Sequence, residues 1–189
     1  MITEVVIKRL DEMLNPLGFE RQKITWNRKI GSFIDVVDVQ TSKTGDTITV
    51  NAGVFHSDVH AKCWGNGIPQ FIEEPSCTVR ARIGQLIDGK DLWWSLDATN
   101  IADEVVDKVN THVLPFLEQM HSAKAMEHFL MKAQVVKQKY PPPIIYLAIL
   151  KHEQGDVNEA CTLLRDLKKK TVGAWQDRIS RIAETLSCS

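Results

Sequence analysis

The chain has 189 residues, of which 43% are hydrophobic and 25% are charged, values that are ordinary for a globular protein and exclude a disordered chain. Its 23 basic and 24 acidic side chains leave a formal charge of −1 at pH 7. A general nucleic-acid binder usually carries a clear basic excess, so the composition argues against that class of function.

The beginning of the chain and its cysteines predict a cytoplasmic protein without a membrane partner. Glu4, Asp11 and Glu12 interrupt the stretch that would have to be apolar in a signal peptide. No apolar run approaches the roughly 20 residues that cross a bilayer. Because no C-x-x-C pair is present, we expect all the cysteines to be reduced thiols, as in a reducing compartment. They are Cys63, Cys77, Cys161 and Cys188.

Apolar side chains recur at helical spacing over residues 2–15, which predicts an amphipathic helix. Pro16 and Gly18 then end it, because proline disfavours a helical residue before it and glycine can form a left-handed cap. Three runs with an alternation of period two follow, separated by short turns that contain glycine. This pattern predicts an antiparallel meander. The three strands are expected at residues 21–30, 33–40 and 47–54.

Residues 56–76 lack periodicity and contain two glycines and two prolines, so we expect a long loop of the kind that is often functional or mobile. Two further strands are predicted at 77–86 and 92–96, on either side of a turn at Asp88-Gly89. From residue 99 onward only helices are predicted. Their expected spans are 99–117, 121–138, 143–154, 156–169 and 173–186.

These elements predict an α+β fold: an N-terminal helix, an antiparallel sheet of about five strands, and then an all-helical C-terminal region. We expect a boundary near residue 121. Residues 1–120 would form the α+β domain, and residues 121–189 a helical appendage packed on it.

Short motifs spread over the first hundred residues resemble the bacterial domain-of-unknown-function family 4304. The resemblance implies an α+β domain and brings no established activity or catalytic residues. The motifs are Leu17-Gly18-Phe19, Trp26-Asn27-Arg28, Val37-x-Val39-Gln40-x-Ser42, Val50-Asn51-x-Gly53-Val54, Cys77-x-Val79-Arg80-x-Arg82 and Trp93-Trp94.

The C-terminal region resembles a single tetratricopeptide-like helical hairpin. About three such units must stack to bury a continuous core, so one hairpin is expected to pack on the N-terminal domain. The residues that carry the resemblance are Tyr146-Leu147-Ala148, Gly155-Asp156, Glu159-Ala160 and Leu163-Leu164.

Arg80 and Arg82 are the first binding candidates, because residues two apart on a strand leave the same face of a sheet. Guanidinium groups beside carboxamides suit a carboxylate or a phosphate, to which they donate bidentate hydrogen bonds. The alternative is that Asp35 or Asp38 pairs with these arginines on a solvated face. The carboxamides that could share their face are those of Gln40 and Asn51.

The adjacent pair Trp93-Trp94 supplies a further candidate, since neighbouring residues on a strand point to opposite faces. An outward Trp94 beside the arginines could stack on a ligand or anchor a partner protein. In the alternative, Trp93 lies in the core and a C-terminal helix covers Trp94.

His56, His60 and Cys63 have the ligand types of a zinc site, and on a helix their spacing would align them on one face. Gly65 and Gly67 instead favour an irregular backbone here. We therefore expect neither a bound metal nor a cofactor.

No nucleophile elbow and no phosphate-binding glycine loop is present in the sequence. The leading hypothesis is a non-catalytic binding or interaction module, an accessory or immunity-type protein whose partner is another protein. The alternative is an enzyme or ligand-binding domain for an anionic small molecule that uses Arg80 and Arg82.

Overall fold

A computed structural model describes residues 2–188. The chain divides into two compact units, which we name by their content. The sheet unit consists of Met1–Phe55 and Gln70–Gln119, and the helical unit consists of His56–Pro69 and Met120–Ser189. The segment 56–69 therefore belongs to the helical unit, although it lies in the chain between the two parts of the sheet unit.

The sheet unit begins with helix α1, Ile2–Leu14, which ends in a short 3-10 turn where Gly18 adopts a left-handed conformation. An antiparallel sheet follows, with strands in the order β1-β2-β3-β4-β5 and β6 paired with β4. The predicted α+β fold with a sheet of about five strands is confirmed. The strands are β1 Glu20–Gln22, β2 Thr25–Ile30, β3 Phe33–Thr41, β4 Thr47–His56, β5 Val79–Arg82 and β6 Trp94–Ser95.

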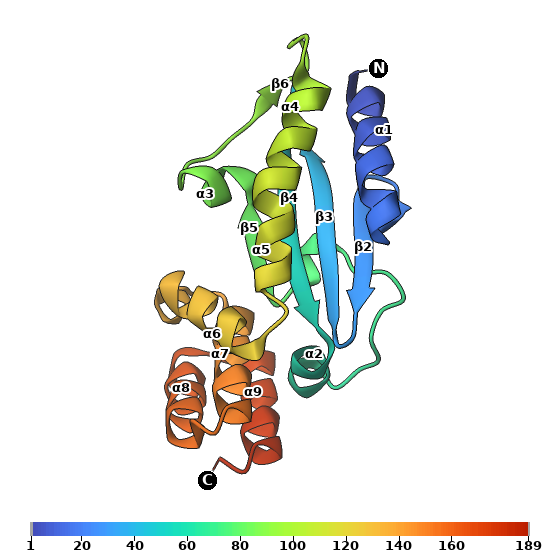
Figure 1. Ribbon diagram of the computed structural model, residues 1–189. Helices are drawn as coiled ribbons and strands as arrows, with labels where there is room; N and C mark the ends of the chain where they lie inside the picture. Colours follow the sequence, from blue (N-terminus) through green and yellow to red (C-terminus); the bar gives the residue numbers. More distant parts are fainter. Residues whose placement is uncertain (1, 189) are drawn as a thin grey trace. The chain divides into compact units, whose positions relative to one another are not determined.

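Helices α1 and α4–α5 cover one face of this sheet (Figure 1). Helix α4, Ile101–Lys108, and helix α5, Leu114–Gln119, are joined by a π-helical turn at Val109–Val113. Alternate strand residues are fully buried beneath these helices and form the main core of the unit. They include Trp26, Val37, Val39, Ile48, Val50, Ala52 and Val54.

The second face of the sheet carries a small apolar cluster of its own. Phe55 of β4 packs there with Ile72 and Cys77, which belong to the segment between α2 and β5. Gly53 makes this close approach possible, because a Cβ at its position would lie 2.7 Å from the Sγ of Cys77. The segment therefore covers part of the second face and leaves the remainder to polar side chains.

The predicted strand at 77–86 is wrong in its extent. β5 ends at Arg82, and a short helix α3, Ile83–Ile87, begins at once. The cause is a local cap: the backbone N–H of Arg82 donates to Oε1 of Gln85 at 3.0 Å. β6 is likewise shorter than the predicted strand at 92–96.

The predicted loop at 56–76 is also wrong at its start, where helix α2, Ser57–Trp64, forms. Nδ1 of His56 accepts a hydrogen bond from the backbone N–H of Asp58 and so caps the helix. Gly65 is its left-handed C-terminal cap. The glycine that favoured an irregular backbone therefore marks the end of a helix.

The helical unit is built around α7, Pro141–Glu153, whose prolines occupy the first turn, where no intrahelical N–H partner is lost. Most of α7 is buried, because α2, α6 and α8 all pack against it. Helix α9 packs against α8 and α2 (Figure 1). The remaining elements are α6 Ala123–Lys132, the 3-10 turn η4 Val135–Lys137, α8 Val157–Lys170 and α9 Ala174–Thr185.

A disulfide joins Cys161 of α8 to Cys188, which follows α9. The expectation of four free thiols is wrong, and with it the cysteine argument for a reducing compartment. The packing of α8 against α9 brings the two Cα atoms to 5.2 Å, within the range that a disulfide bridges. Cys63 and Cys77 are free and buried. None of the helices described between residues 2 and 188 is both long and apolar enough to cross a bilayer.

Candidate functional site

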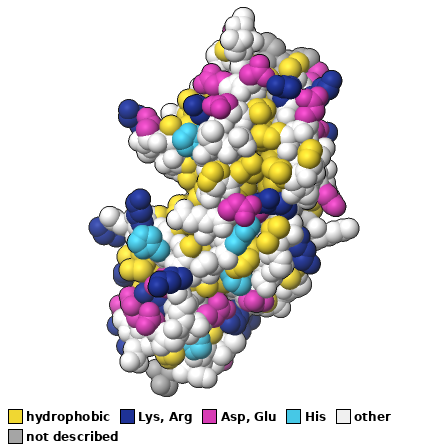
Figure 2. Space-filling model, viewed as in Figure 1, with side chains coloured by type: hydrophobic (Ala, Val, Ile, Leu, Met, Phe, Trp, Pro, Cys, Tyr) yellow, Lys and Arg dark blue, Asp and Glu magenta, His cyan; other side chains and the backbone are white. Residues whose placement is uncertain are grey.

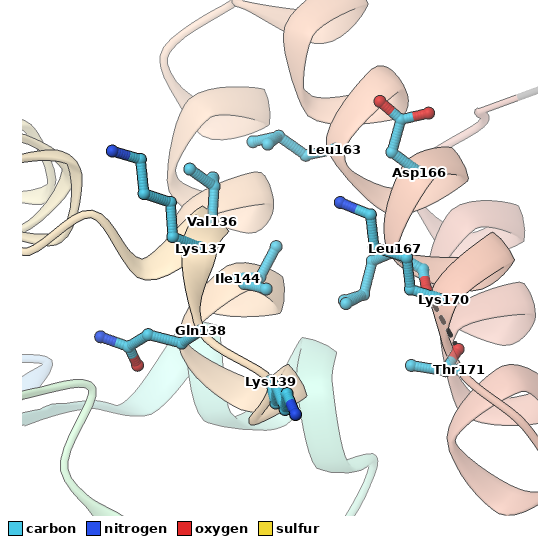
Figure 3. A pocket seen from close by; sticks show the side chains of 10 residues that line it. All are labelled: Val136, Lys137, Gln138, Lys139, Ile144, Leu163, Asp166, Leu167, Lys170 and Thr171. Atoms are coloured by element: carbon cyan, nitrogen blue, oxygen red, sulfur yellow. Dashed lines mark hydrogen bonds between the residues drawn. The ribbon is translucent and has the colours of Figure 1, made fainter.

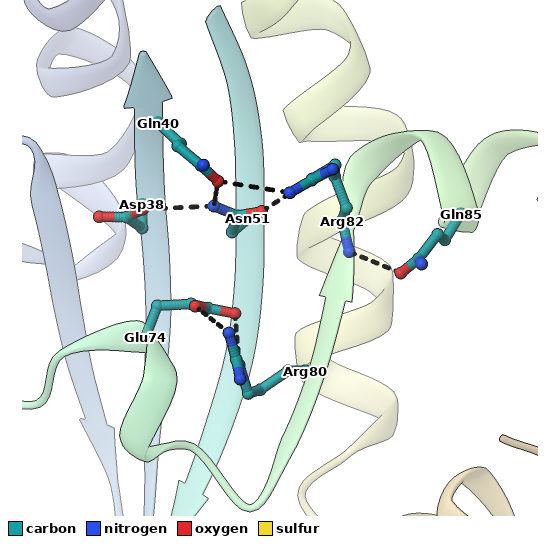
Figure 4. A network of polar contacts seen from close by, with 7 residues as sticks. All are labelled: Asp38, Gln40, Asn51, Glu74, Arg80, Arg82 and Gln85. Carbon is teal, nitrogen blue, oxygen red and sulfur yellow. Dashed lines mark hydrogen bonds and ion pairs between the residues drawn. The ribbon is translucent and has the colours of Figure 1, made fainter. Parts of the chain in front are cut away.

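Arg82 is the centre of a polar network on the second face of the sheet (Figure 4). Its Nε donates to Oδ1 of Asn51 at 3.3 Å, and its Nη2 lies 3.4 Å from Oε1 of Gln40. Nη1 donates to both carboxylate oxygens of Asp91, each at 2.8 Å. Antiparallel pairing explains the first contact, because Arg82 on β5 stands directly opposite Asn51 on β4.

The carboxamides extend the network toward β3. Nδ2 of Asn51 donates to Oε1 of Gln40 at 3.0 Å and lies 3.4 Å from Oδ2 of Asp38. Oδ1 of Asp38 accepts a hydrogen bond from the hydroxyl of Thr25 on β2 at 2.8 Å. Side chains from four neighbouring strands therefore hold one another in place, and the predicted grouping of Arg82 with Gln40 and Asn51 exists.

Trp93 is the tryptophan beside this network. The guanidinium carbon of Arg82 lies 5.2 Å from its ring centroid, within cation–π distance. Nε1 of Trp93 donates to Oδ2 of Asp91 at 3.1 Å. Trp94, the residue that we named from the sequence, is only 5% exposed and pairs with Ile48 in the β4–β6 ladder. Trp93 thus takes the place beside the arginines that the sequence analysis considered for Trp94, whereas the burial of Trp94 agrees with the alternative in which Trp94 is covered.

Arg80 lies on the same side of β5 as Arg82 but makes separate contacts (Figure 4). Its Nε and Nη2 donate to the two carboxylate oxygens of Glu74 at 2.7 and 2.8 Å. Glu74 is buried, whereas the side chain of Arg80 is 46% exposed. Asp35 lies on the helix-covered face and accepts hydrogen bonds from Arg28, whereas Asp38 accepts hydrogen bonds from Thr25 and Asn51.

The positive charges of Arg80 and Arg82 are neutralised by the carboxylates of Glu74 and Asp91. Hydrogen bonds from Arg82, and then from Trp93, hold the pKa of Asp91 below its ordinary value, so Asp91 is an anion at neutral pH. A ligand anion at Arg82 would first have to displace this carboxylate. What the site offers directly is an ordered surface of hydrogen-bonding groups around a partly exposed arginine and tryptophan.

One protein-family model matches residues 10–119, and its description is Domain of unknown function (DUF4304). The chain belongs to this family. The match contains every residue of the network and ends where α5 ends, so nothing in it supports the tetratricopeptide-like resemblance of the C-terminal region. No curated protein and no solved structure matches the chain.

The candidate zinc ligands of the DUF4304 region serve other contacts. His56 caps α2, and Nε2 of His60 lies 3.1 Å from Oδ1 of Asn66. Burial raises the pKa of Cys63 to about 12, so this thiol is protonated and a weak nucleophile at neutral pH. Within residues 2–188, no group of three His, Cys, Asp or Glu side chains is placed to hold a metal ion.

Glu74 and Asp91 are absent from the sequence-based candidates, and Trp93 was considered there only as the inward neighbour of Trp94. The first two neutralise the arginines that the sequence singles out. Asp91 carried a usable signal, because it stands two residues before Trp93 directly after a predicted turn. Glu74 carried none, since its segment has no periodicity that would place it over the sheet.

Proposed function

We propose that the DUF4304 domain is a non-catalytic module that binds another protein through the second face of its sheet, with Arg82 and Trp93 at the centre of the contact. The observation that carries this proposal is the stacked, partly exposed Arg82–Trp93 pair held by Asp91, Asn51 and Gln40. Arginine and tryptophan are the residue types that most often dominate the energy of protein interfaces.

Pre-organisation supports the proposal. Long side chains normally lose rotational freedom on binding, at a cost of about 0.5–1.5 kcal/mol each. Arg82 is already fixed by three partners, and Trp93 by its ring contact and its indole hydrogen bond. A partner that covers them therefore gains contact area with little further ordering.

The charge pattern favours a partner that matches shape and hydrogen bonds over one that brings a large opposite charge. Arg80 and Arg82 each have a carboxylate of the same chain within 2.8 Å. The surface is consequently close to neutral although it contains two arginines. Long-range attraction by charge would contribute little to its association with a partner.

The test compares two tryptophan substitutions of equal size. The full chain with Trp93→Ala is used to capture proteins from the source cells, alongside the wild type and a Trp175→Ala control. Trp175 is also partly buried, but it lies on α9 in the helical unit. We expect a protein whose capture depends on Trp93 and not on Trp175. Its purified form should bind the Trp93→Ala variant at least about 30-fold more weakly, as at a hot spot worth 2 kcal/mol.

The proposal fails if no captured protein discriminates between the two variants, or if the purified partner binds Trp93→Ala within twofold of the wild type. Circular dichroism and thermal melting of both variants show whether the substitutions leave the fold intact. A partner lost equally from both variants would place the contact elsewhere.

The alternative is a domain that binds an anionic small molecule at Arg80 and Arg82. One observation favours it: the carboxylate of Asp91 accepts two hydrogen bonds from Nη1 of Arg82, where a ligand carboxylate or phosphate would bind. In this case Asp91→Ala should create a site. Phosphate or citrate should then raise the melting temperature of Asp91→Ala more than that of the wild type, and equal shifts would remove this alternative.

A further inference from the structure

The helical unit contains a groove of about 730 Å³ that the sheet-face proposal does not use. One wall is the segment 136–139, which includes the end of η4, and the other wall is the C-terminal half of α8 (Figure 3). Ile144 of α7 lies between the walls. Leu163 and Leu167, four residues apart and so on one face of α8, point into the groove.

The rim of the groove is basic. Lys137 and Lys139 line one wall and Lys170 lines the other, against a single acidic residue, Asp166. Lys137 donates to the neutral Oε1 of Gln134, and within residues 2–188 none of the three lysines forms an ion pair. The groove thus carries a local positive excess in a chain whose formal charge is −1.

Apolar surface continues beyond the groove. Val136 in the wall is 44% exposed, and Tyr140 and Val172, which directly follow the lining residues 139 and 171, are 58% and 84% exposed. Basic side chains stand beside hydrophobic ones on this unit near α6 (Figure 2). Burial of such side chains under a partner stabilises an association, because it removes apolar area from water.

We propose that this groove is a docking site for an acidic amphipathic peptide segment of a partner protein. Leucine-like side chains of the peptide would fill the space over Ile144, Leu163 and Leu167. Its carboxylates would pair with the lysines of the rim. Grooves of this type bind segments that present apolar anchors at helical spacing, and opposite charges at the rim set the orientation and register.

The distribution of the lysines distinguishes a peptide from a small apolar acid. A fatty acid has one carboxylate, which one cation at one end of a pocket would neutralise. Here the cations lie on both walls, Lys137 and Lys139 opposite Lys170, so one carboxylate would leave the other wall unpaired. The apolar surface at Tyr140 and Val172 also extends past the cavity, which an elongated ligand can cover.

The test uses the full chain as bait for a displayed library of random peptides of roughly 16 residues, long enough for about four helical turns. We expect the enriched sequences to combine several Asp or Glu residues with apolar residues spaced by three or four. A synthetic peptide of the consensus sequence should bind the wild type. Its affinity should fall at least about tenfold for the triple variant Lys137→Glu, Lys139→Glu, Lys170→Glu, because rim charges then repel it.

A matched control carries the same change of charge on the sheet unit, as Lys8→Glu, Lys43→Glu and Lys90→Glu. This variant should bind the peptide within about twofold of the wild type, since none of the three changed residues lines the groove. A second variant, Leu163→Asp, should also weaken binding. Thermal melting of each variant confirms that it is folded.

The proposal fails if no sequence is enriched, if the enriched sequences lack acidic residues, or if the two charge variants lose equal affinity for the peptide. It also fails if laurate displaces the peptide from the groove, because a small apolar acid would then be the occupant. A dimer of the wild type that the groove variant abolishes would instead identify a second copy. Because Arg82 and Trp93 lie outside the groove, Trp93→Ala should leave peptide binding unchanged. The failure of one proposal therefore does not decide the other.

Discussion

The sheet unit and the helical unit differ in whether the cationic side chains of their candidate binding surfaces are paired with carboxylates. In the sheet unit, Arg28, Arg80 and Arg82 each have a carboxylate of the same chain within 2.8 Å. In the helical unit, the lysines that rim the groove have no such partner among the described residues and stand beside exposed apolar side chains. The helical unit also has a covalent cross-link, whereas Cys77 of the sheet unit is a free thiol.

This difference separates two kinds of binding surface. A surface with internally paired charges presents fixed donors and acceptors, so it selects a partner by geometry and responds weakly to salt. A surface with unpaired cations around an apolar groove attracts acidic partners, and salt weakens that attraction. The pairing of arginines also implies that the stability of the sheet unit depends on individual carboxylates.

The largest effect that we predict is for Asp35→Ala. Asp35 is fully buried and accepts two hydrogen bonds from Arg28, whose other partner is the exposed Glu118. Removing one member of a buried pair leaves the other charge poorly compensated, which costs about 3–5 kcal/mol. Urea denaturation should show a loss of at least about 3 kcal/mol in the free energy of unfolding.

The control for that prediction is Asp107→Ala, which removes an exposed ion pair of 3.4 Å with Lys108. An exposed pair contributes about 0–1 kcal/mol, so this variant should be nearly as stable as the wild type. If Asp35→Ala loses as little free energy of unfolding as the control does, the buried Arg28–Asp35 pair does not contribute to stability as proposed.

The next prediction concerns the disulfide, which should stabilise the helical unit. Cys161 and Cys188 are 27 residues apart, and a loop of that length corresponds to about 3–4 kcal/mol of chain entropy. The double variant Cys161→Ser, Cys188→Ser should unfold its helical unit at lower denaturant, with the sheet unit unchanged. Thiol titration of the denatured wild type without reductant should give two thiols, and four would contradict the cross-link.

A smaller effect is expected from salt, which should weaken binding at the groove more than binding at the sheet face. Raising the ionic strength from about 0.05 to 0.5 M shortens the Debye length to less than half. We expect the affinity of the groove for its acidic peptide to fall about tenfold, as three exposed charges of modest energy would allow. The affinity of the sheet face for its partner should change by less than about threefold. An equal salt dependence of the two affinities in calorimetric titrations would contradict the proposed difference between the two surfaces.

The smallest effect is a pH dependence confined to the helical unit. Burial lowers the pKa of both His56 and His60 below the ordinary imidazole value of about 6.5, and for His56 the carboxylates of Glu153 and Asp58 oppose this effect. The unfolded chain therefore takes up protons first as the pH falls. Stability should decrease below about pH 6.5 and continue to fall down to the lowered pKa of the folded state.

The variant His56→Asn isolates this contribution, because asparagine retains an acceptor for the backbone N–H of Asp58. Its melting temperature should change less between pH 7.5 and 5.5 than that of the wild type. An unchanged slope would show that His56 does not contribute to the acid sensitivity.

Local patterns in the sequence predict the elements well, because period-two and helical spacing reflect which side chains each element must bury. The same rule places Arg80 and Arg82 on one face. It does not predict their partners, since Glu74 and Asp91 come from a loop and a turn whose positions depend on tertiary packing. Likewise, α2 is only eight residues long and is stabilised mainly by its caps and by packing in the helical unit.

The two tryptophans show why a face is harder to predict than a strand. β6 is only two residues long, so alternation within it is not informative. Its register against β4 decides the face: Trp94 pairs with Ile48, which is fully buried beneath the helices. A shift of one residue would exchange Trp93 and Trp94, and the sequence contains no signal for that register.

The most direct test of the sheet-face proposal is hydroxyl-radical footprinting of the full chain with and without the partner captured through Trp93. Trp93 and Trp175 are both partly exposed and should be oxidised in the free protein, whereas the buried Trp94 serves as an internal reference. The proposal predicts that the partner protects Trp93 and leaves the oxidation of Trp175 unchanged. Undiminished oxidation of Trp93 in the saturated complex would contradict it.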